Sequence, residues 1–497
     1  MSLATLLAFE RPPIDWHAIA PELTLLIIGS LITLADIIWT DRIRPLMPTL
    51  AGAGLLATLV PVLTLAVDGT DRAMFGGAYV IDDMSLVLKA LFLIAGYVIV
   101  LLSVDYIRDG DYYENEYYSL LLSSLLGMVL IASSRDLITM FVALELLSIP
   151  AYMLAGWRKG GATSNEASIK YYLMGVFASA VMLYGMSLVF GMTGSTAFDD
   201  IRVALSGDDP SSMTILGILF VLIGFGFKVS AVPFHTWAPD TYEGAPTPVT
   251  AFLAVASKAA GFVALLQLVY VAFAARDDVV EPFFWIMAAL TMTVGNLLAL
   301  RQTNIVRMLA YSGVAQGGFM LAPFAVAGDA TDQSIKAVVT YLIIYAFMNL
   351  GAFAVVLAVA AKTRSGEISS YAGLFQRAPG LATAMTIFLA ALAGIPPVGG
   401  WFAKFLIWNA LIDASSLQGS LLAVVVAINA VIAFGYYGRV MREMWMNDAP
   451  ESDGSRFVVT PALTAAIVLT IVATVALGIY PEWAGRFGDI SSTLALR

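Results

Sequence analysis

Five lysines lie inside long apolar stretches of the chain, whereas none of the eighteen arginines does: Lys89, Lys170, Lys228, Lys258 and Lys404. An ionisable group buried in a bilayer costs at least ~2.5 kcal/mol and is therefore a candidate for function. Arginine cannot release its proton, but a lysine held away from water can approach the neutral form. The choice of lysine therefore points to proton exchange.

The five lysines differ in depth. Lys89 lies about one and a half turns into its stretch and Lys170 about one turn, so their ammonium groups could reach the membrane surface by snorkelling. We favour this interpretation for Lys89 and leave both interpretations open for Lys170. Lys228, Lys258 and Lys404 are too deep to snorkel easily, which leaves proton transfer or a structural ion pair.

Glu145 is the only carboxylate near the middle of an apolar stretch. A lone buried glutamate needs a cation, and we expect Lys228 to be that partner. Two unit charges about 4 Å apart interact by ~4 kcal/mol at an effective dielectric constant near 20. Moving one charge through 100 mV costs about 2.3 kcal/mol. Making and breaking this contact could therefore load and release a proton, while a static pair would be structural only.

Few other residues carry chemistry. His235 titrates near neutral pH and lies in a polar stretch close to Lys228, so it is either a proton relay or a loop histidine that hydrogen-bonds the backbone. The chain has no cysteine and only two histidines, which excludes Cys-ligated iron–sulfur clusters and thiol chemistry. A net charge of −10 without a basic stripe argues against nucleic acid. We expect no metal and no cofactor in this chain.

An all-α polytopic membrane fold must position these residues. The 497 residues are 60% hydrophobic and 12% charged, far from the composition of a soluble domain. We expect a single membrane domain in which thirteen loop Lys and Arg lie on one side and eight on the other, so the positive-inside rule places both termini outside. The fourteen expected spans lie near 16–38, 46–67, 84–107, 117–134, 137–156, 166–190, 212–243, 249–273, 282–300, 308–327, 337–361, 381–412, 419–438 and 459–480.

Two of these spans cannot be unbroken helices, because one contains Pro233 and Pro239 and the other contains Pro396 and Pro397. A packing kink would explain one break. Two breaks, each at the fourth position of a five-span unit, predict inverted repeats with a transport pathway between them. The expected segments are a three-helix segment at 1–116, repeats at 117–273 and 282–446, and a last helix with the tail at 459–497.

The sequence around the first break, residues 227–252, reads FKVSAVPFHTWAPDTYEGAPTPVTAF. It resembles the signature of the antiporter-like subunits of proton-pumping NADH:quinone oxidoreductase (respiratory complex I). Supporting matches over about 84–445 are Glu145 between leucines, SKAAG at 257–261, RMLAYS at 307–312, and GIPP at 394–397 followed by FAK at 402–404. The chain looks most like the N type of these subunits. Lys404, where the M type has glutamate, argues against the M type, and the absence of a long extension after Arg497 argues against the L type.

The resemblance implies a fourteen-helix fold with two half-channels for protons. Glu145 and Lys228 would form the gating pair, Lys258 the central relay and Lys404 the outward step, with Lys170 and His235 as candidate relays. NADH, FMN, iron–sulfur clusters and quinone would belong to other subunits. Partners would include another antiporter-like subunit (chain M) and the small chains J and K, in the lipid bilayer of a bacterial inner (plasma) membrane with both termini on the periplasmic side.

Two alternatives stay open. Subunits of multi-chain sodium/proton antiporters share much of this pattern, so the chain could be driven by an ion gradient. It could also be a scaffold whose lysines are merely paired.

Overall fold

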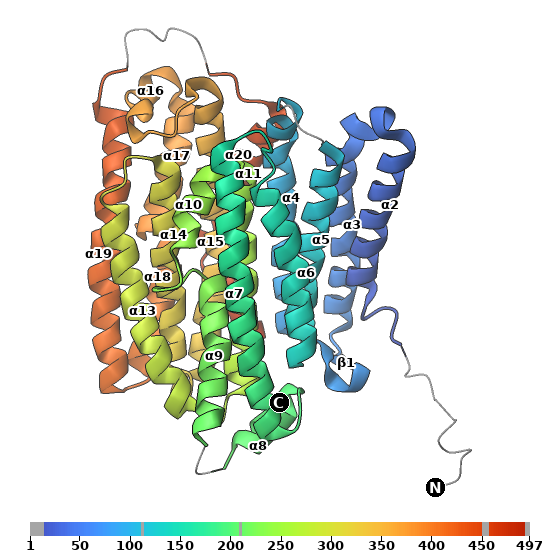
Figure 1. Cartoon of the computed structure of the whole chain (residues 1–497). Coiled ribbons are helices and arrows are strands. Elements are labelled where there is room, and N and C mark those ends of the chain that lie inside the picture. The colour runs from blue at the N-terminus through green and yellow to red at the C-terminus, as the bar shows by residue number, and fades with distance from the viewer. Residues whose placement is uncertain (1–13, 111–113, 208–210, 450–456, 493–497) are drawn as a thin grey trace.

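The computed structural model describes residues 14–110, 114–207, 211–449 and 457–492. Long helices run side by side between two ends of the molecule (Figure 1). Twelve described helical segments are long and apolar enough to cross a membrane, and two broken helices complete the fourteen expected spans. In chain order the elements are α2 Ala20–Ile43, α3 Met47–Asp68, β1 Arg72–Met74, β2 Tyr79–Ile81, α4 Asp83–Arg108, α5 Glu114–Ser133, α6 Leu137–Ala155, α7 Ala162–Thr193, α8 Phe198–Leu205, α9 Ser212–Lys228, α10 Trp237–Gly244, α11 Thr247–Phe252, α12 Lys258–Gln267, α13 Asp277–Ala299, α14 Ile305–Leu321, α15 Thr331–Thr363, α16 Leu374–Arg377, α17 Pro379–Ala393, α18 Gly400–Asp413, α19 Leu417–Met446, α20 Pro461–Ile479 and α21 Glu482–Ser492.

Polar side chains mark where several helices begin. Asp82 accepts a hydrogen bond from the backbone of Ser85, whose hydroxyl in turn accepts from the Asp82 backbone N–H, and this capping box starts α4. The Asp136 carboxylate caps α6 and the Asn304 side chain caps α14, each by accepting hydrogen bonds from two backbone N–H groups. These caps satisfy backbone N–H groups at the helix ends.

Both predicted breaks are present. The first span consists of α9 and α10, separated by residues 229–236, and the second consists of α17 and α18, separated by 394–399. Pro233, Pro396 and Pro397 lie in these gaps, whereas Pro239 lies in the first turn of α10, where the missing N–H has no intrahelical acceptor to lose.

The span after the first break is also irregular. Two π-helical turns, Leu253–Ser257 and Leu268–Ala272, precede and follow α12. The apolar periodicity of this stretch predicts one regular helix, so the sequence analysis missed both turns. Turns of this kind are frequent at functional sites.

The most buried membrane spans are three consecutive stretches of the second half of the sequence, apart from the more exposed α13 between them. The most apolar window of Thr247–Ala272 is entirely buried, and 94% of the windows in Ile305–Val326 and Thr331–Thr363 is buried. By contrast, only 17% of the window in α2 is buried, so α2 is a peripheral helix. Helices that are apolar all round belong in a core or against lipid.

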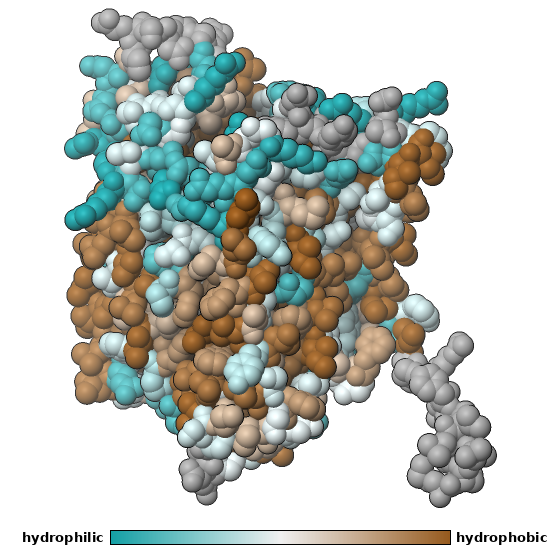
Figure 2. Space-filling model, in the orientation of Figure 1, coloured by the Kyte–Doolittle hydropathy of each residue, from teal (hydrophilic) through white to brown (hydrophobic). Residues whose placement is uncertain are grey.

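The two ends of the bundle differ in polarity. Hydrophilic side chains gather at the upper end of the molecule, and a broad apolar band lies below it (Figure 2). The described chain begins and ends at the lower end, where the antiparallel strands β1 and β2 also lie (Figure 1). This agrees with the expectation that the two termini share a side. The boundaries expected for the repeats stay a prediction.

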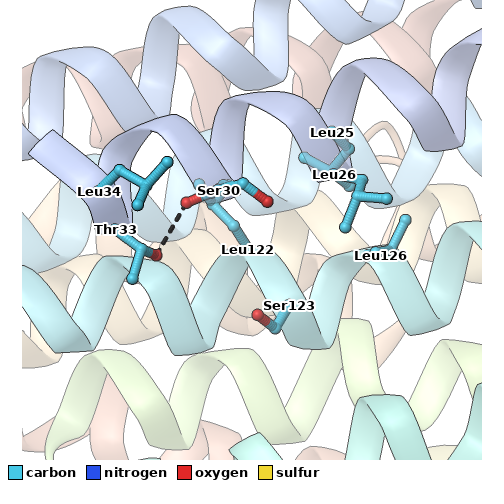
Figure 3. A pocket seen from close by; sticks show the side chains of 9 residues that line it. Leu25, Leu26, Ser30, Thr33, Leu34, Leu122, Ser123 and Leu126 are labelled. Atoms are coloured by element: carbon cyan, nitrogen blue, oxygen red, sulfur yellow. Dashed lines mark hydrogen bonds between the residues drawn. The ribbon is translucent and has the colours of Figure 1, made fainter.

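A shallow groove runs between the peripheral helix α2 and the neighbouring helix α5 (Figure 3). Leucine side chains line most of it, and the hydroxyl groups of Ser30, Thr33 and Ser123 interrupt this apolar lining. The Thr33 hydroxyl contacts the Gly29 carbonyl at 2.9 Å and the Ser119 hydroxyl at 3.0 Å, which links the two helices.

Candidate functional site

Lys228 is the last residue of α9, directly before the first break, and is 4% exposed. Its Nζ donates to the Ser148 hydroxyl of α6 at 2.8 Å and lies 3.5 Å from the Tyr171 hydroxyl of α7. The side chain also packs against α12, because a Cβ placed on Gly261 would lie 3.2 Å from Lys228 Cγ. Lys228 therefore sits where α6, α7, α9 and α12 meet.

Lys258 begins α12 directly after a π-helical turn and is 1% exposed. Its Nζ donates to the Gly313 carbonyl of α14 at 2.6 Å. In the π turn, the Ala254 carbonyl accepts the Tyr345 hydroxyl of α15 at 3.3 Å. Gly313 packs directly against the ammonium group, because a Cβ there would lie 3.5 Å from Nζ, at ordinary contact distance.

Lys404 lies on α18 and reaches back across the second break to the end of α17. Its Nζ donates to the carbonyls of Leu392 and Ala393, both at 2.9 Å, and stands 4.8 Å from the Phe319 ring centroid. The last carbonyls of a helix carry partial negative charge. Lys228 and Lys404 lie on opposite sides of their breaks in sequence, yet both are placed at the C-terminal end of the half-helix before the break.

Three buried polar side chains connect the surroundings of Lys258 and Lys404. The Gln316 amide donates to the Leu392 carbonyl that Lys404 also uses, at 3.0 Å, and to the Tyr437 hydroxyl at 3.1 Å. The Tyr437 hydroxyl lies 2.5 Å from the Ser312 hydroxyl, one residue before the carbonyl that binds Lys258. The sequence analysis missed this bridge, since neutral side chains in helices give no charge signal.

None of Lys228, Lys258 and Lys404 forms an ion pair within the described chain, and the contact expected between Glu145 and Lys228 is not made. The Glu145 carboxylate instead accepts the Ser179 hydroxyl of α7 at 2.6 Å, and its side chain is partly exposed. Ser148, three residues further along α6, holds Lys228. The acid of α6 and the amine of α9 are therefore bound to separate hydroxyl groups.

Lys170 and His235 belong to the surroundings of the first break. Lys170 is 43% exposed and pairs with Asp240 of α10 and with Glu166, each at 2.7 Å. Arg307 of α14 pairs with Asp240 at 2.9 Å, so three helices share one ion-pair network. His235 lies in the gap itself, with its ring centroid 6.4 Å from that of Tyr311, and its Nδ1 is buried without a hydrogen-bond partner.

The expectation that Lys89 snorkels is wrong. Lys89 is fully buried and its Nζ lies 2.6 Å from the Glu22 carboxylate of α2. Glu22, which the sequence analysis did not single out, is in the first turn of α2 and only 4% exposed in the folded chain. Long-range packing against α4 and β2 covers it, and a local pattern cannot show such packing.

Comparisons with known proteins agree with this architecture. Residues 134–430 match the family model described as NADH:quinone oxidoreductase/Mrp antiporter, transmembrane. NADH-quinone oxidoreductase subunit N of Trichlorobacter lovleyi is 38% identical over 96% of both chains, and subunit N of Heliobacterium modesticaldum is 40% identical over 89% of this chain and 90% of that one. The chain belongs to the NADH:quinone oxidoreductase/Mrp antiporter family.

Solved structures of this family share the fold and differ in sequence. A chain of respiratory complex I from Thermus thermophilus is 29% identical, with a TM-score of 0.77 and coverage of 94% of this chain and 98% of that one. A chain of the Mrp complex from Dietzia sp. has a higher TM-score of 0.84, with 97% coverage of both chains, but only 19% identity. The backbone thus fits both branches of the family, while sequence identity favours the NADH:quinone oxidoreductase branch.

Proposed function

We propose that this chain translocates protons as a membrane subunit of an NADH:quinone oxidoreductase, with Lys228, Lys258 and Lys404 as the proton-carrying groups. Its relatives are named as subunits of that enzyme. The redox chemistry, with NADH, FMN, iron–sulfur clusters and quinone, would lie in other subunits. This chain would supply the path across the membrane and no redox centre of its own.

The observation that carries the proposal is that three buried amines form no ion pair within the part of the chain that the structure describes. Each Nζ is held by hydroxyl or carbonyl oxygens, which are neutral acceptors. Burying an unpaired ammonium is strongly unfavourable, so the neutral amine becomes accessible. A group that can be either charged or neutral can accept a proton from one neighbour and give it to the next.

The hydrogen-bonded arrangement suggests the order of transfer. Lys228 packs on α12, the helix that begins with Lys258. From Lys258 the bridge of Ser312, Tyr437 and Gln316 leads to Lys404. The two helix breaks flank this row of three lysines. Backbone groups that lose their helical hydrogen bonds at membrane depth are tolerated where they are buried in protein or line water. We propose half-channels that meet the row near Lys228 and Lys258 and leave it near Lys404.

Glu145 would act as the gate of the row. Bound to Ser179, as in the present structure, it forms no ion pair with Lys228. If Glu145 turned to within about 4 Å of Lys228, the attraction would be ~4 kcal/mol at an effective dielectric constant near 20. That exceeds the ~2.3 kcal/mol needed to move one charge against 100 mV. Switching between the two positions would therefore be strong enough to load or unload a proton.

The roles of Lys170 and His235 follow from their positions beside the first break. We propose that His235 passes protons toward Lys228 or Lys258, because its Nδ1 is buried and free of a protein partner. Lys170 has two carboxylate neighbours and considerable exposure, which suits a residue that holds α7 to α10 at the channel entrance.

The surroundings of Glu145 support a neighbouring subunit. A partly exposed carboxylate in the middle of a span would be costly against lipid. We propose that another membrane subunit covers this face, in line with the expected chains M, J and K. We also propose a bacterial inner membrane with the charged upper end toward the cytoplasm and both termini periplasmic, following the positive-inside rule.

The fold alone does not distinguish the proposed function from that of a sodium/proton antiporter subunit. Measurements in reconstituted vesicles separate the two. Proton uptake linked to NADH oxidation by the assembled complex is the expected result. Exchange driven by a sodium gradient without any redox substrate would overturn it. Undiminished pumping after Lys228→Ala or Lys404→Ala in an assembled complex would instead indicate a scaffold.

A further inference from the structure

A second buried ionisable site lies outside the row of lysines, in the N-terminal helices. Lys89 of α4 and Glu22 of α2 are 2.6 Å apart at Nζ and Oε1, and their side chains are 0% and 5% exposed. The same Nζ donates to the Tyr79 hydroxyl of β2 at 2.9 Å. The Tyr79 hydroxyl donates to the Ala18 carbonyl at 3.1 Å, so the cluster joins α4, β2 and the segment that leads into α2.

This pair is unlike the other ion pairs in the described chain. It is the only one between a lysine and a carboxylate in which both side chains are buried. A buried ion pair loses several kcal/mol of hydration per ion, and the attraction offsets this loss only when the remaining polar atoms are also satisfied. The stability of the charged pair therefore depends on the other contacts of Glu22 and Lys89.

Those contacts are incomplete. Glu22 Oε2 is buried and has no hydrogen-bond partner in the described chain. An ammonium has three N–H donors, and the described contacts of Lys89 use two of them, to Glu22 and Tyr79. A carboxylate oxygen without a donor is left incompletely solvated, so this buried ion pair is less stabilised than one whose polar atoms are all hydrogen-bonded.

The site is also close to the aqueous end of the bundle. Charged side chains lie around it in the hairpin and the neighbouring loop: Arg72 pairs with Asp15 at 2.6 Å, and Arg135 pairs with Asp82 at 2.5 Å. Asp82 also acts on Lys89 through its charge. Burial and the charge of Glu22 both raise the pKa of Tyr79, so this hydroxyl stays protonated and serves as a fixed neighbour.

We propose that Glu22 and Lys89 form a protonatable site that exchanges protons with the aqueous phase at the β1–β2 end of the bundle. In the internal step an Nζ–H bond of Lys89 breaks and an Oε1–H bond of Glu22 forms, which converts the ion pair into a neutral amine and a neutral acid. No electrons are transferred. The Oε1–H bond of Glu22 then breaks as the proton passes to water at the β1–β2 end, and a proton returning from water to Glu22 and on to Nζ restores the ion pair. The proposal rests on proton translocation by this chain and adds a site away from Lys228, Lys258 and Lys404.

The test compares Lys89→Arg with Lys89→Met in the complete complex reconstituted in vesicles, with protons moved per NADH as the measurement. Arginine keeps the charge and the pairing with Glu22 but cannot release its proton. We therefore expect K89R and K89M to lower the proton-to-NADH ratio by the same factor. A wild-type ratio in K89R beside a lowered ratio in K89M would show that only the pairing matters and would overturn the proposal, as would wild-type ratios in both.

Two further variants keep the result decisive. Where K89R does not assemble, the double variant E22Q/K89M, which is uncharged and similar in volume, must also lower the ratio. A wild-type ratio, or a failure of both variants to assemble, overturns the proposal in favour of a purely structural pair. Lys258→Met serves as the comparator. If K258M lowers the ratio and the Lys89 variants do not, only this inference fails, whereas an unchanged ratio in K258M contradicts the proposed function itself.

Discussion

Replacing Ser179 by alanine should shift Glu145 toward Lys228. In the present structure the Ser179 hydroxyl is the described hydrogen-bond partner of the Glu145 carboxylate, at 2.6 Å. A hydrogen bond to a charged group contributes about 1.5–3 kcal/mol. Because the bond exists only when the acid and the amine are apart, its loss favours the paired state by that amount. At 1.4 kcal/mol per factor of ten, the balance between the two states moves by ~10- to 150-fold.

The shift should slow proton release, because a paired Lys228 keeps its positive charge. We expect NADH-driven proton uptake by S179A complex in vesicles to fall about tenfold or more, with the complex fully assembled. Ser179→Thr, which keeps the hydroxyl, should retain most of the rate. The matched control is Ser187→Ala on the same helix, since the exposed Ser187 hydroxyl donates only to the Tyr184 carbonyl. Wild-type uptake in S179A, alongside a clear loss in Glu145→Gln, would refute the proposed switch.

Two further predictions concern the second break. Gly394→Ala places a side chain at a φ of +89°, with its Cβ 2.9 Å from Lys404 Cδ. We therefore expect a less stable subunit and a lower yield of assembled complex on native gels, and an unchanged yield would contradict this. Gln316→Leu removes the amide that bridges the Leu392 carbonyl and Tyr437 and keeps a similar side-chain volume. We expect a severalfold lower rate of NADH-driven proton uptake with normal assembly. A wild-type rate would show that the bridge is not used.

Much of the fold could be predicted because prolines and charged residues are rare in the apolar stretches, so the few that occur there stand out. Pro233 and the pair Pro396 and Pro397 cannot continue a helix, so both breaks were predictable from backbone chemistry alone. Lysine in an apolar stretch is similarly conspicuous, and Lys228, Lys258 and Lys404 are indeed buried. Strong local signals of this kind need no knowledge of tertiary packing.

The parts that were missed depend on contacts between distant segments. Glu22 was not singled out from the sequence, because its burial arises only when α4 and β2 pack over it. The same packing corrects the interpretation of Lys89. Gln316 and Tyr437 are neutral, and they are 121 residues apart in sequence. Glu145 was assigned to Lys228 because charge was the only criterion available, whereas in the fold Ser179 provides a nearer partner.

The central claim is that buried amines with no ion-pair partner among the described residues carry protons through this chain. Lys258 tests it most directly, because this residue lies between the two breaks and its Nζ has only the Gly313 carbonyl as a described hydrogen-bond partner. The measurement is the number of protons moved per NADH oxidised by an assembled complex that carries Lys258→Met. The account predicts a lower ratio than in the wild type, and an unchanged ratio would contradict it.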